Sequence, residues 1–181
     1  MTHHVRGLHP LWPAVAILLS IAAVTAPADP QLTVKYGQDG HDYQYTGAGL
    51  RFDPIWSSEA SNYAIDLRPA IEIGHMRYSG QSIGPSGLTE GGGLGIVHIE
   101  RAQGIWRPYA EAGFGLVFFS NDRLGTRSFS IHNQFTEQVG LGVNYRDRWS
   151  VGWLLSHYSN GGLKEPNSGM DLQQIVLNLY F

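Results

Sequence analysis

The sequence predicts an all-β fold, an eight-stranded antiparallel transmembrane β-barrel of the outer-membrane type, and three observations lead to that prediction. Apolar and polar residues alternate with a period of two along about eight segments, as they do in strands with two different faces. The more polar face carries positive and negative charges in balanced numbers, which suits the filled interior of a small barrel. The chain ends in alternating apolar residues and the aromatic Phe181, which resembles the C-terminal signal of outer-membrane proteins.

The first 28 residues are expected to be a cleavable signal peptide, which leaves residues 29–181 as a single barrel domain. One arginine precedes an apolar run at 11–25, and Ala26-Pro27-Ala28 has the small-x-small pattern of a cleavage site. We therefore expect cleavage after Ala28. The alternative is a transmembrane anchor, but the run is short for a membrane span and Pro13 interrupts it.

The first half of the remaining chain contains four candidate strands. In Leu32–Tyr36 apolar positions alternate with threonine and lysine, and Ala48, Leu50 and Phe52 alternate with Arg51 and Asp53. The segment Tyr63–Ile73 is clearer, because its isoleucines and leucine share one parity while its charged residues hold the other. Gly91–Ile99 is the weakest of the four, since both of its parities are apolar.

The second half contains four more candidate strands. Trp106–Phe118 opposes aromatic and aliphatic residues to arginine, glutamate and glycine, and Phe135–Tyr145 opposes them to glutamine, threonine and asparagine. Trp149–Leu155 has serine and glycine between its large apolar residues, and Ile175–Phe181 ends the chain with the same alternation. Eight strands in total fit one closed sheet.

Two architectures fit this pattern: a soluble barrel with an apolar interior, and an outer-membrane barrel with an apolar exterior. The charged residues of the polar parity can pair across a narrow interior, which favours the membrane barrel. Long connections at 79–90, 120–128 and 160–170 also alternate with short ones at 101–104 and 146–148, as in outer-membrane barrels. The charged residues of the polar parity are Asp66, Arg68, Glu72, Arg107 and Glu111. Aromatic residues near the strand ends, as membrane interfaces require, also favour the membrane barrel; they are Trp106, Tyr145, Trp149 and Tyr180.

Composition narrows the function further. Acidic residues number 15 and basic residues 12, with no lysine or arginine run, which argues against a nucleic-acid partner. The chain has no cysteine, so disulfides and thiolate chemistry are excluded. Its histidines are scattered without an Asp or Glu cluster at metal-ligand spacing, so we expect neither a metal nor another cofactor.

A candidate catalytic set lies in the last quarter of the chain. His157 and Ser159 are two residues apart in a strand, so they point to one side, roughly 6–7 Å apart along the backbone. An imidazole at that spacing can take the proton of a serine hydroxyl, and Asp171, after the next loop, can hold the imidazole in the required tautomer. All three share the apolar parity and so face lipid, where polar groups are costly unless they are functional. If residues 146–148 form a turn, Glu137 lies opposite His157 on the preceding strand.

The same residues carry a resemblance to a known family. His157-Tyr158-Ser159-Asn160, followed by Gly162-Leu163-Lys164, Pro166-Asn167 and a glycine before an acid, resembles the active-site hairpin of PagL-type lipid A 3-O-deacylases. Two preceding strands resemble the family as well, around Tyr109–Gly115 and Phe135–Gly142. The resemblance covers about the last 80 residues, whereas the first half is similar only in its barrel pattern.

The resemblance implies an outer-membrane serine esterase that removes the ester-linked 3-hydroxyacyl chain at position 3 of lipid A without a metal. It implies His157 as base, Ser159 as nucleophile and Asp171 as the acid. It also implies oxyanion donors at Asn160 and the backbone amide of Gly162, with Asn167 and Glu137 in support. The chain departs from the family pattern at Asp171, where the family has glutamate, and Glu165 in the same loop is an alternative acid.

Two other functions stay open at this point: a non-catalytic surface or adhesion barrel, and a soluble periplasmic lipid-binding barrel. For the enzyme, both chain ends are expected on the periplasmic side of a Gram-negative outer membrane. The site then faces the outer leaflet, with lipopolysaccharide as substrate and outer-membrane lipid around it. A homodimer is a further expectation, because a second copy would cover a lipid-facing site.

Overall fold

The computed structural model describes residues 30–82 and 84–181, so the expected signal peptide and its cleavage site lie outside the described residues. Strands without helices make up the regular structure of these residues, which confirms the predicted all-β class. The strands are β1 (Gln31–Asp39), β2 (Tyr43–Arg51), β3 (Trp56–Ala60), β4 (Tyr63–Tyr78), β5 (Gly87–Arg101), β6 (Trp106–Phe119), β7 (Arg123–Leu124), β8 (Arg127–Ser128), β9 (Asn133–Tyr145), β10 (Trp149–Ser159) and β11 (Met170–Tyr180).

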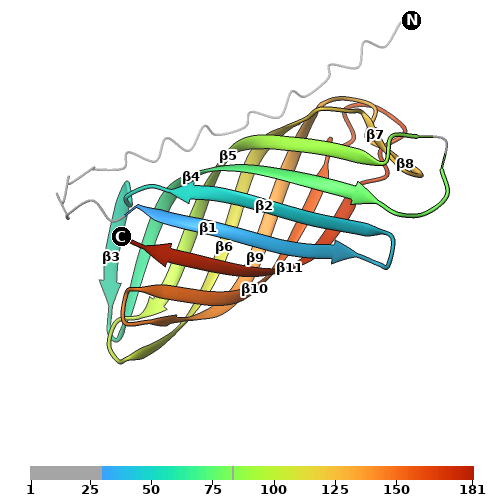
Figure 1. Ribbon diagram of the computed structural model, residues 1–181. Helices are drawn as coiled ribbons and strands as arrows, with labels where there is room; N and C mark the ends of the chain where they lie inside the picture. Colours follow the sequence, from blue (N-terminus) through green and yellow to red (C-terminus); the bar gives the residue numbers. More distant parts are fainter. Residues whose placement is uncertain (1–29, 83) are drawn as a thin grey trace, which may run out of the picture.

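Eight long strands close into the predicted antiparallel barrel (Figure 1). Their order around the wall is β1, β11, β10, β9, β6, β5, β4 and β2, and β2 pairs again with β1. The short β3 pairs with the start of β4, while β7 and β8 form a separate ribbon in the connection between β6 and β9. The barrel therefore closes where the first strand meets the last.

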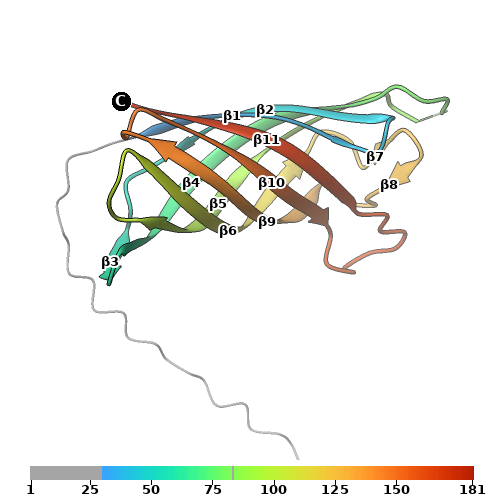
Figure 2. The ribbon, with the colours of Figure 1, turned by 90° about the horizontal axis from the view of Figure 1, so that it is seen from below.

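The connections divide between the two ends of the barrel as the sequence predicts. One end holds the C-terminus and the short turns at 102–105 and 146–148, and the other holds the long connections at 79–86, 120–132 and 160–169 (Figure 2). Two connections break the alternation: the β1–β2 turn at 40–42 is short, and residues 52–62 at the short-turn end include β3. We call the end with the long connections the loop end.

The barrel interior is filled by paired charges and amides rather than by apolar side chains alone. Arg51 donates to both carboxylate oxygens of Glu111 at 2.7 and 2.9 Å, and Lys35 binds Glu72 while donating to the side chain of Gln138 at 3.2 Å. The predicted inward charges are thus confirmed as interior groups with partners. Their partners Lys35, Arg51 and His98 were not among the predicted set.

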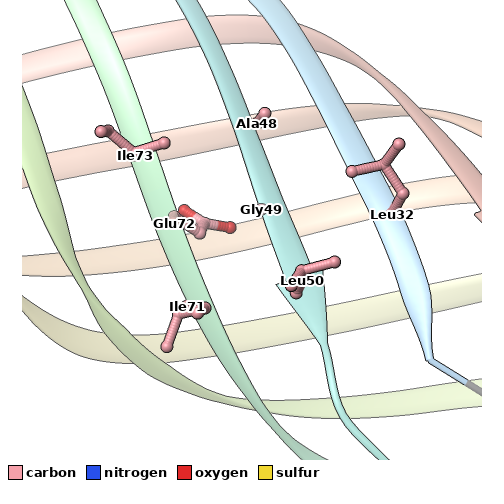
Figure 3. Close-up of a pocket in the computed structure, with 7 residues that line it drawn as sticks. All are labelled: Leu32, Ala48, Gly49, Leu50, Ile71, Glu72 and Ile73. Atoms are coloured by element: carbon pink, nitrogen blue, oxygen red, sulfur yellow. The ribbon is translucent and has the colours of Figure 1, made fainter.

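The outward face is apolar, with large exposed side chains along every long strand. At the short-turn end, the rings of Trp106, Tyr145 and Trp149 form one cluster with centroid separations of 4.5–5.8 Å. A shallow apolar hollow lies over Ala48, between Leu32 on β1 and Ile73 on β4 (Figure 3). Within the described residues, no helix is long and apolar enough to cross a membrane.

The buried Arg51–Glu111 pair gives a test of the interior. Replacing Glu111 with glutamine leaves the guanidinium of Arg51, whose side chain is 3% exposed, without its carboxylate. We expect the free energy of unfolding to fall by about 3–5 kcal/mol, as when one partner of a buried ion pair is removed. Denaturant titration of the barrel in detergent measures this change. The exposed Glu59→Gln on β3 is the control, and equal midpoints for both variants would contradict the prediction.

Candidate active site

His157 and Asp171 lie side by side on the outward face near the loop end of the barrel. The β10–β11 register pairs the two residues directly, and His157 Nδ1 lies 2.6 Å from Asp171 Oδ1. Both side chains are reachable from outside, at 43% and 69% exposure. A bond of this length between an imidazole and a carboxylate is a strong, charge-assisted one. It holds the ring with Nδ1 toward Asp171 and leaves Nε2 for another partner.

Ser159 is the last residue of β10 and shares the outward face with His157. Its strand partner is Phe135 on β9, and its Oγ accepts a long hydrogen bond of 3.4 Å from the backbone amide of Gly161. Gly161 has a φ of 65°, in the left-handed region that glycine adopts without strain. The chain thus turns away immediately after the serine. His157 Nε2 and Ser159 Oγ therefore belong to one side of one strand, as the spacing predicts.

The predicted oxyanion donors are engaged elsewhere in this structure. The side chain of Asn160 is fully buried, and its Nδ2 donates to the carbonyls of Phe129 at 2.9 Å and Lys164 at 2.7 Å. Its Oδ1 accepts the backbone N–H of Gly162 at 2.8 Å. Both amide hydrogens of Asn160 and the N–H of Gly162 therefore have partners within the loops. Asn160 thus holds the turn that follows Ser159.

The two remaining acids differ in their relation to His157. Glu137 lies on β9 directly opposite His157, which is the position that the 146–148 turn predicts. It is exposed, and the Nδ1 of His157 bonds to Asp171 rather than to Glu137. Glu165 accepts the backbone N–H of Asn167 at 3.0 Å within the loop. Asp171, and not Glu165, is therefore the acid on the imidazole.

The loop at 160–169 is fastened to residues 128–130, a contact that the sequence did not predict. Ser128 and Ser168 exchange two hydrogen bonds of 2.9 and 3.1 Å, and the hydroxyl of Ser130 donates to the carbonyl of Pro166 at 2.6 Å. Asn167 accepts the backbone N–H of Asn160 through its Oδ1 at a longer 3.4 Å. These bonds fix the path of the chain between Ser159 and Asp171.

Two further observations bear on what the site binds. A shallow hollow with a mainly apolar lining lies on the outward face of β1, β10 and β11, beside Tyr36, Trp153 and Ile175. Gln173, two residues from Asp171 on the same face, also lines it. Among the residues that the structure describes, no group of three His, Asp or Glu side chains is placed to hold a metal ion.

Comparison with known proteins gives one consistent match. The family model for lipid A 3-O-deacylase (PagL) matches residues 31–180. The chain is 28% identical over 170 residues to a lipid A deacylase PagL of Bordetella bronchiseptica, which covers 91% of this chain and 93% of that protein. It is 38% identical over 65 residues to a lipid A deacylase PagL of Pseudomonas aeruginosa, which covers 36% of this chain and 38% of that one.

A solved structure agrees with this match. The crystal structure of the outer membrane enzyme PagL superposes with a TM-score of 0.72 at 25% identity, covering 82% of this chain and 98% of that one. The resemblance that the last 80 residues carry is confirmed, and it extends over nearly all of the described strands. One crystallised PagL is an outer-membrane enzyme, and the chain belongs to the lipid A 3-O-deacylase (PagL) family.

Proposed function

We propose that the protein hydrolyses the ester that links a 3-hydroxyacyl chain to position 3 of lipid A. Family membership supports the substrate and reaction class. The observation that carries the mechanism is the His157–Asp171 bond on the outward face, with Ser159 two residues further on the same side. A histidine that is oriented by a carboxylate and placed near a serine is the arrangement that activates a weak nucleophile.

In the proposed mechanism, Asp171 accepts the Nδ1–H of His157 and so leaves the lone pair on Nε2. His157 takes the proton of Ser159 as the hydroxyl oxygen attacks the ester carbonyl. The tetrahedral intermediate collapses when the same proton passes to the oxygen of the sugar, which leaves as an alcohol. Water, deprotonated by His157, then attacks the acyl-serine and releases the 3-hydroxy fatty acid.

We assign stabilisation of the oxyanion of the tetrahedral intermediate to the backbone N–H groups of Asn160 and Gly161, instead of to the side chain of Asn160. Both amides follow the nucleophile directly, and each makes only a 3.4 Å bond, which is longer than an ordinary N–H···O bond. Such bonds are readily exchanged for a developing negative charge, whereas the 2.8 Å bond of Gly162 is not. Asn160 and Asn167 are then the residues that hold these amides in place.

The position of the site on the barrel supports a substrate in the outer leaflet. His157, Ser159 and Asp171 lie on the apolar outward face, at the end opposite the C-terminus and the short turns. In an outer-membrane barrel the long loops lie outside the cell, so lipopolysaccharide in the outer leaflet can present its ester there. The hollow beside Tyr36 and Trp153 includes Gln173, two residues from Asp171, and suits the acyl chain that is removed.

Mass spectrometry of lipid A, from a Gram-negative host with and without the protein, tests this function. We expect expression to shift lipid A by the mass of one hydroxyacyl group, with the free 3-hydroxy fatty acid recovered in equal amount. Unchanged lipid A would reject the esterase and favour a non-catalytic barrel. The homodimer stays a proposal too, and cross-linking of the protein in membranes tests it.

Glu137 is expected to have a smaller effect than the catalytic set. It lies opposite His157 without taking the place of Asp171, so Glu137→Gln removes only a cross-strand charge interaction. Interactions of that kind are worth at most about 1 kcal/mol, so kcat/KM should fall by about two- to fivefold. Turnover of lipid A in detergent micelles measures the change. Full activity of Glu137→Gln would show that Glu137 has no role in the reaction.

A further inference from the structure

Arg127 of β8 lies at the loop end of the barrel, between the end of β1 and the loop that leads to Asp171. Its Nη2 lies 2.8 Å from Asp39 Oδ2, and its Nη1 donates to the carbonyl of Gly169 at 2.9 Å. The guanidinium also lies over the ring of Tyr43, with Cζ 4.7 Å from the ring centroid. Arg127 is 26% exposed and Asp39 is 19% exposed, so both are largely withdrawn from solvent. One side chain thus joins three separate segments.

Asp39 connects Arg127 to the catalytic acid. The same carboxylate oxygen that binds Arg127 accepts the backbone N–H of Asp171 at 3.2 Å. Asp39 is the last residue of β1, and β1 lies next to β11 in the barrel wall. The bond therefore fixes the backbone at the point where Asp171 extends its side chain toward His157. Because the carboxylate of Asp171 is 69% exposed, its own backbone largely determines its position.

Gly169 connects Arg127 to the imidazole itself. A Cβ atom at Gly169 would lie 3.3 Å from Cε1 and 3.9 Å from Nε2 of His157, so the backbone here lies beside the Cε1–Nε2 edge of the imidazole. Gly169 has a φ of 60°, which a residue with a side chain adopts only with strain. Arg127 holds the carbonyl of this residue, and so holds the backbone that lies against the imidazole.

From these contacts we propose that Arg127 and Asp39 are positioning residues for the hydrolysis. Arg127 holds Gly169 against His157 directly, and through Asp39 it holds the backbone of Asp171, so both neighbours of the imidazole depend on one guanidinium. Arginine suits this task because its planar fork donates in two fixed directions at once. The inference rests on the proposed function of His157, Ser159 and Asp171.

The test compares Arg127→Gln and Asp39→Asn with Arg123→Gln in turnover of lipid A. Arg123 is the matched control, because it is exposed on β7 of the same ribbon and its strand partner is Ser128 rather than Asp39 or Gly169. We expect both test variants to lower kcat by about 10- to 100-fold, as small displacements of catalytic groups do, while KM stays within about twofold. Arg127→Lys keeps the charge but not the fork, so its kcat should lie between those of Arg127→Gln and the wild type.

A fluorophosphonate probe, which labels an activated serine, gives a second readout that does not depend on lipid A. We expect the rate of Ser159 labelling to fall in Arg127→Gln by the same factor as kcat, in barrels shown to be folded by their heat-modifiable gel mobility. The inference is overturned if Arg127→Gln behaves like Arg123→Gln, or if it raises KM and leaves kcat unchanged. If either of these results is found while Ser159→Ala is inactive, the positioning role of Arg127 is rejected and the proposed hydrolase function is kept. A wild-type protein that neither labels nor deacylates rejects both.

Discussion

Replacing Ser159 with alanine is expected to abolish deacylation of lipid A altogether. The variant removes the one protein atom that the proposed mechanism bonds to the acyl carbon, while the outward face and the His157–Asp171 pair stay in place. Removing the nucleophile of a serine hydrolase triad lowers kcat by roughly 10⁶-fold, so no product should be detectable. Lipid A mass spectra from cells that express the variant should match those of cells without the protein.

Ser156→Ala provides the matched control, since it makes the same change three residues earlier on the same strand. Ser156 points into the barrel and donates to the side chain of Gln174 at 2.7 Å, so it is remote from the outward site. We expect this variant to deacylate lipid A normally. Deacylation by Ser159→Ala at a rate near that of Ser156→Ala would rule out Ser159 as the nucleophile.

Asp171→Asn is expected to have the second largest effect, a loss of roughly 10²- to 10⁴-fold in kcat. An amide in place of the carboxylate no longer fixes the proton on Nδ1 of His157, so the ring loses the tautomer in which Nε2 acts as a base. Pre-steady-state or single-turnover assays with lipid A in micelles measure the chemical step directly. Near-normal turnover by Asp171→Asn would show that another group orients the imidazole.

Asp171→Glu separates the role of the acid from its length. Glutamate is the residue that the family pattern has at this position, and it is one methylene longer. Because the carboxylate of Asp171 is 69% exposed, the barrel wall leaves room for the longer side chain to bend back to Nδ1. We expect Asp171→Glu to keep activity within about tenfold of the wild type, far above that of Asp171→Asn.

The sequence predicted much of the fold because the barrel obeys one simple period. Parity alone placed Glu111 inside and His157 outside, since successive side chains of a strand point to opposite faces. The three-residue turn at 146–148 then fixed the register of β9 against β10, which placed Glu137 opposite His157. Period and register are local properties, so one sequence is enough to predict them.

What the sequence did not predict depends on where the loops lie in three dimensions. Arg127 was one scattered cation among others, and nothing in its neighbourhood indicates that its guanidinium reaches Asp39, 88 positions earlier. The hydrogen bonds of Asn160 were not predicted for the same reason, because its two amide hydrogens are taken by carbonyls of two different loop segments. Strand parity carries no information about such contacts.

The place where the barrel closes has a consequence for biogenesis. The acid of the candidate site is on β11, its backbone is bound by the last residue of β1, and these two strands form the seam at which the ends of the sheet meet. A chain still in transit through the periplasm, with its first and last strands apart, therefore lacks the complete hydrolytic arrangement. On the proposed mechanism the enzyme is therefore expected to reach full activity only when the barrel has closed, so the rise in the deacylation rate would report closure.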